Sequence, residues 1–173
     1  MELSKSLPVQ LKLFNFAKKE VSLSGQYHIA DFPRISEIAS NKKNNVEVDL
    51  SFYLENDKTP CIDGIIKLDI VLPCQRCLEE LHIALNINFT LAFVRHEEQG
   101  EELGSHYEIY VTEEDELKTI DLISDEILLS IPMVPMHDYD CMAEINTQEI
   151  VVKKSENPFS ILKNIQIADG GKE

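Results

Sequence analysis

The sequence is poor in features that mark several large classes of protein. It has no tryptophan, and its 16 lysines and arginines face 31 aspartates and glutamates, which gives a net charge of −15. A protein that wraps its whole surface in nucleic acid must neutralise phosphates, so this balance argues against that class. We find no aromatic strand of the kind that stacks RNA bases. Scattered lysine pairs still leave room for a small basic patch.

Long apolar runs are also missing. None approaches the ~20 residues needed to cross a bilayer, and residues 1–20 lack the uninterrupted apolar core and cleavage site of a signal peptide. Four cysteines without an export signal favour a reduced protein of the cytoplasm. With 43% hydrophobic and 27% charged residues, the 173-residue chain is expected to fold as a single domain, 1–173.

Alternating apolar residues predict β-strands over much of the chain. The pattern is clear in residues 46–54, 65–72 and 81–93. Because the last two runs flank one short connection, we expect a long antiparallel hairpin over about 65–94. Further strands are predicted at 107–111 and in two short N-terminal runs, around 9–13 and 21–23.

Helical spacing is rarer. Four isoleucines predict a helix over 119–131, with Thr119 as its N-cap and Pro132 as its end. Short helices are also predicted at 31–39 and 157–165, each with a proline in its first turn.

The connections complete the predicted architecture. Residues 95–106 are expected to form a polar loop, and 138–173 a partly extended C-terminal segment that ends in the short helix. The predicted fold class is α+β, an antiparallel sheet with a few short helices packed on it.

The clearest chemical motif is Cys-Gln-Arg-Cys, in the predicted hairpin connection. Cys74 and Cys77 have the spacing of one half of a tetrahedral zinc site, and His137 and Cys141 could supply the other half. The simpler alternative is reduced structural thiols without a cofactor. A thiol redox site is a further alternative, in which Arg76 would support a thiolate. Such sites place the two cysteines at the start of a helix in a βαβ unit, whereas here they lie between two predicted strands.

Motifs of hydrolytic and phosphate-binding enzymes are missing from the sequence, which has no GxSxG, HExxH or glycine-rich phosphate loop. Asp125 and Glu126 interrupt an otherwise apolar predicted helix. The simpler interpretation places both on its solvent face, and the alternative presents them to a partner's arginine or lysine. We therefore expect a protein that is not an enzyme.

Negative charge is concentrated in one region. Residues 97–126 hold twelve acids and one base, whereas residues 1–47 hold seven bases and five acids. One end of the protein should therefore be strongly negative, either as a solvated surface or as a face that attracts a basic partner. The densest run in this region is Glu113, Glu114, Asp115 and Glu116.

Three stretches, in this order, resemble the YceD family, the large-ribosomal-RNA-subunit accumulation proteins of bacteria. They are a strand that runs into CQRCLEEL (74–81), the stretch IDLISDEILLSIPMVPMHDYDC (120–141), and NPFSILKNI (157–165). The resemblance implies a role in the synthesis, processing or stability of 23S ribosomal RNA and a genetic association with a large-subunit ribosomal protein.

The resemblance also implies which positions matter. The family's motif positions fall on Cys74, Cys77, Asp125, Glu126, Pro132, Pro135, His137, Asp138, Asn157, Pro158 and Phe159. Many relatives have more cysteines after the helix, which suggests zinc in those members. This sequence has only Cys141 there, beside His137.

These observations together predict a non-enzymatic factor for the large ribosomal subunit. Its acidic end would bind a basic ribosomal or rRNA-processing protein, with Asn157, Pro158 and Phe159 as a further contact. Two alternatives stay open: a basic patch that binds rRNA directly, and a zinc or thiol redox protein that uses Cys74 and Cys77.

Overall fold

The structure, a computed structural model, describes residues 7–142. The chain divides into two compact units, Met1–Cys141 and Met142–Glu173. Only the first is described here, because all of the second except Met142 lies outside the described residues. The predicted helix at 157–165 and the candidate contacts Asn157, Pro158 and Phe159 also lie outside them, so these remain predictions, as does the single domain 1–173.

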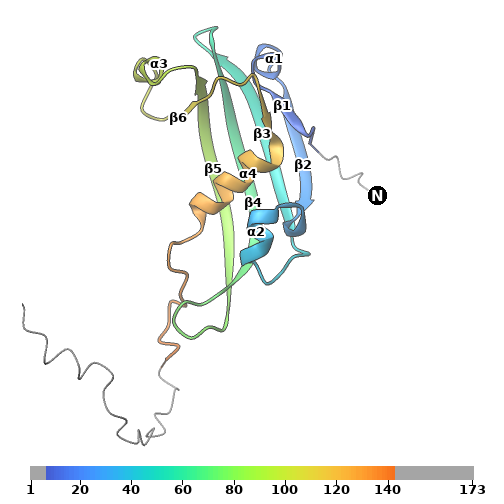
Figure 1. The fold of residues 1–173 in the computed structure, drawn as a ribbon, viewed down its shortest axis with the longest axis vertical. Helices are drawn as coiled ribbons and strands as arrows, with labels where there is room; N and C mark the ends of the chain where they lie inside the picture. Colours follow the sequence, from blue (N-terminus) through green and yellow to red (C-terminus); the bar gives the residue numbers. More distant parts are fainter. Residues whose placement is uncertain (1–6, 143–173) are drawn as a thin grey trace, which may run out of the picture. The chain divides into compact units, whose positions relative to one another are not determined.

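A five-stranded sheet forms the body of the first unit, in the order β2-β3-β4-β5-β6 (Figure 1). The strands are β2 (Ser22–His28), β3 (Asn45–Glu55), β4 (Thr59–Pro73), β5 (Glu80–Val94) and β6 (Glu108–Val111). The predicted hairpin is confirmed, since β4 and β5 pair antiparallel from Cys61↔Ala92 to Pro73↔Glu80. The α+β class is confirmed as well.

One strand pairing differs from the prediction of an antiparallel sheet. The strand predicted near 107–111 exists as β6, but it runs parallel to β5 and pairs only with Leu91–Val94. A parallel pair needs a crossover of about a dozen residues or more, and residues 95–107 supply it. This crossover contains the short helix α3 (Glu97–Glu101), where the sequence predicted only a loop.

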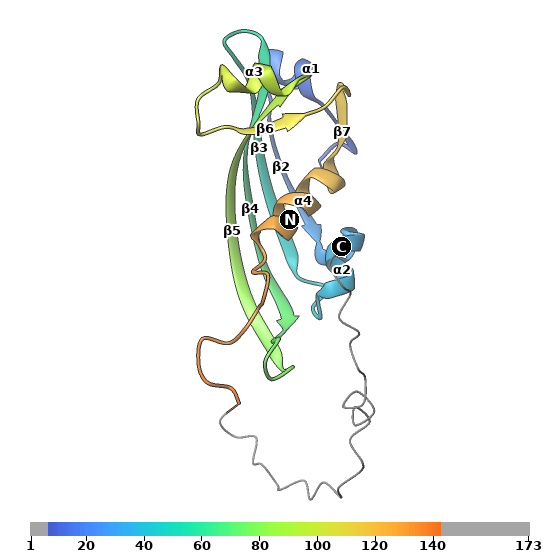
Figure 2. The same ribbon diagram turned by 60° about the vertical axis from the view of Figure 1, so that its left-hand side comes forward.

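Short helices cover one face of the sheet, as Figure 2 shows. They are α1 (Leu13–Lys18), α2 (Pro33–Ile38) and α4 (Thr119–Ser130), and a single 3₁₀ turn, Ile29–Asp31, precedes α2. The predicted helices at 31–39 and 119–131 are thus confirmed. None of the helices in residues 7–142 has the length and apolarity to span a bilayer.

The start of α4 corrects another prediction. Lys118, and not Thr119, occupies the N-cap position. Thr119 is fully buried and its hydroxyl donates a hydrogen bond to the carbonyl of Pro8. A small second sheet explains this, because β1 (Gln10–Lys12) pairs with β7 (Glu116–Lys118) and brings the N-terminal chain against the helix start.

The core lies between the helices and the inner face of the sheet. Alternate residues of β3 are buried on this face while their neighbours are exposed, which is the pattern expected of a sheet with one solvated side. Ile123 and Ile127 of α4 are fully buried against it. Gly64 is required near the middle, because a β-carbon there would lie 1.9 Å from the Phe89 ring on the paired strand.

Candidate metal centre

The connection between β4 and β5 folds into a tight turn around Cys74. The Cys74 N–H donates to the carbonyl of Glu79 at 2.8 Å, and the Leu78 N–H donates to the carbonyl of Cys74 at 2.9 Å. The Arg76 N–H points at the Cys74 Sγ, 3.5 Å away. The turn therefore holds the first cysteine by its backbone and aims N–H groups at its sulfur.

The chain after α4 returns to this turn and supplies the other two side chains. The Gln75 N–H donates to the carbonyl of Pro135 at 2.8 Å, which docks the returning segment on the turn. His137 and Cys141 follow directly and face the two cysteines of the hairpin. Residues about 60 positions apart in sequence thus meet at the tip of the longest hairpin.

The ligand atoms of Cys74, Cys77, His137 and Cys141 all lie within 4.8 Å of one another. The Sγ atoms of Cys74 and Cys141 are 3.9 Å apart, and the Cys77 Sγ is 3.5 Å from the His137 Nδ1. A tetrahedral zinc ion with Zn–S bonds near 2.3 Å separates its sulfurs by about 3.8 Å. The four side chains could therefore hold one metal ion with little movement.

The orientation of His137 also suits a ligand. Its Nε2 lies 3.1 Å from the carbonyl oxygen of Glu80, to which a protonated Nε2 would donate. That hydrogen bond leaves Nδ1 as the nitrogen that faces the sulfurs. Metal-bound histidines commonly have their second nitrogen fixed in this way.

Arg76 adds positive charge beside the sulfurs. Its Nε lies 3.1 Å from the Cys141 Sγ, and its guanidinium donates to the carbonyls of His137 and Tyr139. Three thiolates and a divalent ion carry a net negative charge, which this cation offsets. The same side chain ties the returning segment to the turn.

The cluster favours the thiolate form of two of its three cysteines. Burial alone would raise the pKa of Cys74, but the backbone N–H groups of Cys77 and Arg76 outweigh burial and lower its pKa to about 5. Burial likewise opposes ionisation of Cys141, and hydrogen bonds from Arg76 and His137 lower its pKa. The thiolate is the form that binds zinc, so these two shifts favour a metal ion. The other two side chains shift the opposite way. The backbone N–H of Glu79 lowers the pKa of Cys77, but burial and the neighbouring sulfurs outweigh it and raise that pKa, and a hydrogen bond to Cys141 raises the pKa of His137.

Comparison with known proteins gives the family. A family model described as "Large ribosomal RNA subunit accumulation protein YceD" matches residues 62–166. The chain belongs to the YceD family. A curated relative from Haemophilus influenzae, named "Large ribosomal RNA subunit accumulation protein YceD", is 31% identical over 168 residues, which cover 92% of this chain and 96% of the relative. No solved structure matches this YceD chain.

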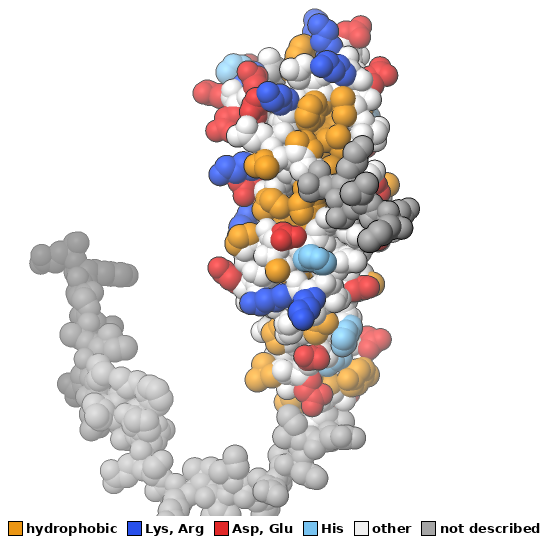
Figure 3. Space-filling view, turned by 90° about the vertical axis from the view of Figure 1, so that its right-hand side faces the viewer, with side chains coloured by type: hydrophobic (Ala, Val, Ile, Leu, Met, Phe, Trp, Pro, Cys, Tyr) orange, Lys and Arg blue, Asp and Glu red, His pale blue; other side chains and the backbone are white. Residues whose placement is uncertain are grey.

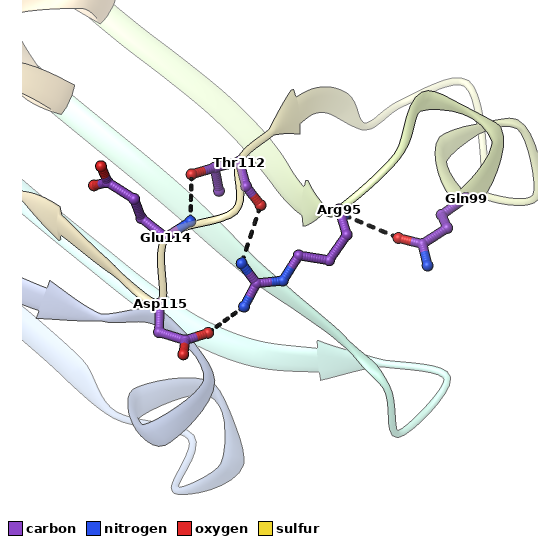
Figure 4. Close-up of polar contacts among 5 residues, drawn as sticks. All are labelled: Arg95, Gln99, Thr112, Glu114 and Asp115. Atoms are coloured by element: carbon purple, nitrogen blue, oxygen red, sulfur yellow. Dashed lines mark hydrogen bonds and ion pairs between the residues drawn. The ribbon is translucent and has the colours of Figure 1, made fainter.

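The acidic end of this YceD chain is more structured than the sequence suggested. Asp115 forms an ion pair with Arg95, which also donates to the carbonyl of Thr112 at 3.3 Å (Figure 4). Glu116 pairs with Lys12 at 3.5 Å. Two of the four acids in the predicted contact run are therefore engaged within the chain. The side chains of Glu113 and Glu114 make no ion pair within residues 7–142.

A groove of about 710 Å³ lies at this end, between α1, the β3–β4 turn, α3 and the chain that follows β6. It could not be predicted from the sequence, because its walls come from five separate segments. Its charged lining residues are Lys58, Arg95, Glu98, Glu102, Glu114 and Asp115. Phe14, of which 48% is exposed, forms part of an apolar wall.

The two helix acids have different environments. Asp125 is half-buried and forms an ion pair with Arg34 of α2. Glu126 is only 7% exposed, so its predicted place on the solvent face of the helix was wrong. The helix face toward the sheet includes this position, and burial, followed by the charges of Glu108 and Asp125, raises the pKa of Glu126 to about 7.

Proposed function

We propose that this protein supports the accumulation of large-subunit ribosomal RNA by binding a basic partner at its acidic end. It would do so in the cytoplasm and without catalysing a reaction. The partner class is a ribosomal or rRNA-processing protein of the large subunit. The name of the Haemophilus influenzae relative supports the rRNA role. The observation that carries the binding mode is the groove at the acidic end.

The charges in the groove favour a basic segment. Asp115 and Arg95 form an ion pair and neutralise each other. The remaining charged residues of the groove are one lysine, Lys58, and three carboxylates, Glu98, Glu102 and Glu114. The groove is therefore negative. The exposed ring of Phe14 adds a surface on which a guanidinium or ammonium group can stack. An arginine or lysine of a partner would therefore meet both charge and an aromatic face.

A charge-neutralising variant tests this binding mode. We expect the triple variant Glu98→Gln, Glu102→Gln, Glu114→Gln to lose about tenfold in affinity for RNA-free proteins extracted from large ribosomal subunits. The matched control, Glu37→Gln, Glu47→Gln, Asp49→Asn, removes the same charge from exposed positions elsewhere. Equal binding by both triple variants at low salt would contradict the proposal.

Direct binding of rRNA has less support. Lys43 and Lys67 share a shallow groove on the sheet, but Glu47 and Asp69 line it too. Sedimentation of cell lysate through a sucrose gradient, with and without RNase, separates the two modes. Binding through protein predicts that large-subunit proteins stay attached after RNase treatment.

We also propose that Cys74, Cys77, His137 and Cys141 bind zinc as a structural ion. The separations of the ligand atoms and the donor set support this assignment. Metal analysis of the purified chain should find about one zinc per chain. A redox enzyme would instead lose turnover when Cys74 and Cys77 are changed to serine, whereas a structural site predicts only a loss of stability.

A further inference from the structure

Leu78 is a residue of the hairpin tip whose side chain belongs to neither the core nor the candidate metal site. Its backbone has φ = 66°, and 75% of its side chain is exposed. Residues with a β-carbon disfavour this left-handed conformation, which usually selects glycine or asparagine. The β3–β4 turn follows that preference, with Asn56 and Asp57 at φ = 52° and 59°. The hydrogen bond from the Leu78 N–H to the Cys74 carbonyl accounts for this backbone conformation, because it closes the turn. The turn does not account for the choice of leucine, whose apolar side chain is exposed.

Two more apolar side chains are exposed on the segment that returns to the hairpin tip. Met136 is 49% exposed and Tyr139 is 58% exposed, and both belong to the segment that returns after α4. The segment contacts the turn at residues next to them: the Arg76 guanidinium donates to the Tyr139 carbonyl, and the Cys77 Sγ lies 3.5 Å from the His137 Nδ1. We call Leu78, Met136 and Tyr139 the tip surface.

The metal ligands join the two segments that carry the tip surface. Cys77 directly precedes Leu78, and His137 directly follows Met136. The rings of His137 and Tyr139 lie 4.8 Å apart. An ion bound by Cys77 and His137 would therefore fix the relative positions of all three apolar side chains.

Acidic side chains border the tip surface. Glu79, Glu80 and Asp138 are all exposed and are sequence neighbours of its members. Apolar and acidic side chains lie side by side at the lower end of the molecule in Figure 3. Charge complementarity then selects a partner that places lysine or arginine around an apolar pocket.

We infer that the tip surface is a docking site for a protein partner whose apolar pocket, bordered by lysine or arginine, receives Leu78. The inference rests on the proposed binding of a large-subunit protein, and the proposed metal ion would order the surface further. Hydrogen bonds from Gln75 to Pro135 and from Arg76 to His137 already join the two segments without it. It adds a second contact, separate from the acidic groove. The groove is lined by residues of α1, α3 and the β3–β4 turn, and these elements lie at the end of the sheet opposite the hairpin tip (Figure 1). The energy of this contact comes mainly from apolar burial, so it should persist at high salt.

The test is the Leu78→Gly variant of the full chain, loaded with zinc. Glycine suits the left-handed backbone, so the fold should be kept or made more stable. We expect the variant to bind RNA-free large-subunit proteins about tenfold more weakly at high salt, with the same zinc content. The matched control is Leu129→Gln, because Leu129 of α4 is 78% exposed but lies outside the tip surface.

A photo-crosslinking residue at position 78 identifies what the tip surface contacts. A crosslink to a large-subunit protein, at an apolar site flanked by lysine or arginine, would support the inference. A crosslink to a second copy of this chain, or to rRNA in intact subunits, would overturn it. So would equal binding by Leu78→Gly and the wild-type chain, or a wild-type chain that binds no large-subunit protein at high salt.

The two proposals fail in different ways. If the chain contains no zinc but Leu78→Gly still weakens binding, the metal assignment is wrong and the docking site stands. If only the groove variants weaken binding, and only at low salt, the acidic groove stands and the tip surface does not.

Discussion

The two ends of the sheet are stabilised by different means. At the hairpin tip, Cys74 is fully buried and four ligand atoms converge within 4.8 Å. At the acidic end, the ion pair of Arg95 and Asp115 and that of Lys12 and Glu116 are all at least 40% exposed. Exposed pairs stabilise a fold weakly and are screened by salt. The comparison therefore predicts a tip that depends on metal and an acidic end that depends on ionic strength.

The largest expected effect is at the tip, from Cys74→Ser. Loss of one ligand should abolish zinc binding, because a tetrahedral structural site needs all four. Hydrogen exchange should then become fast in residues 74–80 and 135–141, while the acidic end keeps its protection. Mass spectrometry of exchanged peptides, together with metal analysis, measures both changes.

Cys61→Ser is the control for this variant. Cys61 is as buried as Cys74 but lies outside the cluster. It should lower stability without changing the zinc content. Equal zinc content in Cys74→Ser and the wild-type chain would contradict a zinc site at the tip.

A smaller effect on stability is expected from Glu126→Gln in α4, which lies between the two ends. The pKa of Glu126 is about 7 in the folded protein and about 4.3 when unfolded, so the folded state binds more protons between these values. The free energy of unfolding therefore falls as pH rises from about 4.3 to 7. Above pH 7 the total loss is on the order of 3 kcal/mol. The variant should be more stable than the wild type at pH 8 and nearly equal at pH 4.5.

Urea unfolding at both pH values measures this difference. Asp125→Asn is the control, since Asp125 is half-buried and paired with Arg34. It should change stability slightly and without the same dependence on pH. An equal effect of Glu126→Gln at the two pH values would show that folding does not raise the pKa of this carboxyl group.

The smallest effect is expected at the acidic end, from Arg95→Ala. This substitution removes the ion pair with Asp115 and the hydrogen bond to the Thr112 carbonyl. Because the groups are exposed, the free energy of unfolding should fall by only about 1 kcal/mol or less, and by less still at high salt. A loss as large as that from Cys74→Ser would remove the contrast between the two ends.

Much of the fold could be predicted because its strands are long and regular. Alternation with period two identified β3, β4 and β5, and the short connection between the last two fixed the hairpin. The parallel direction of β6 could not be predicted, since a four-residue strand after a long crossover fits either direction. Thr119 was misassigned because its hydroxyl bonds to Pro8, a partner more than 100 residues away.

The sequence by itself determined the candidate ligand types and their two pairs, Cys74 with Cys77 and His137 with Cys141. It also determined that negative charge gathers in residues 97–126. Only the tertiary structure decided that the two pairs meet at one hairpin tip, that Asp115 and Glu116 are paired, and that Glu126 is buried. The physical reason is that spacing and composition are local properties. Ligand convergence, ion pairing and burial depend on which distant segments the sheet and α4 bring together.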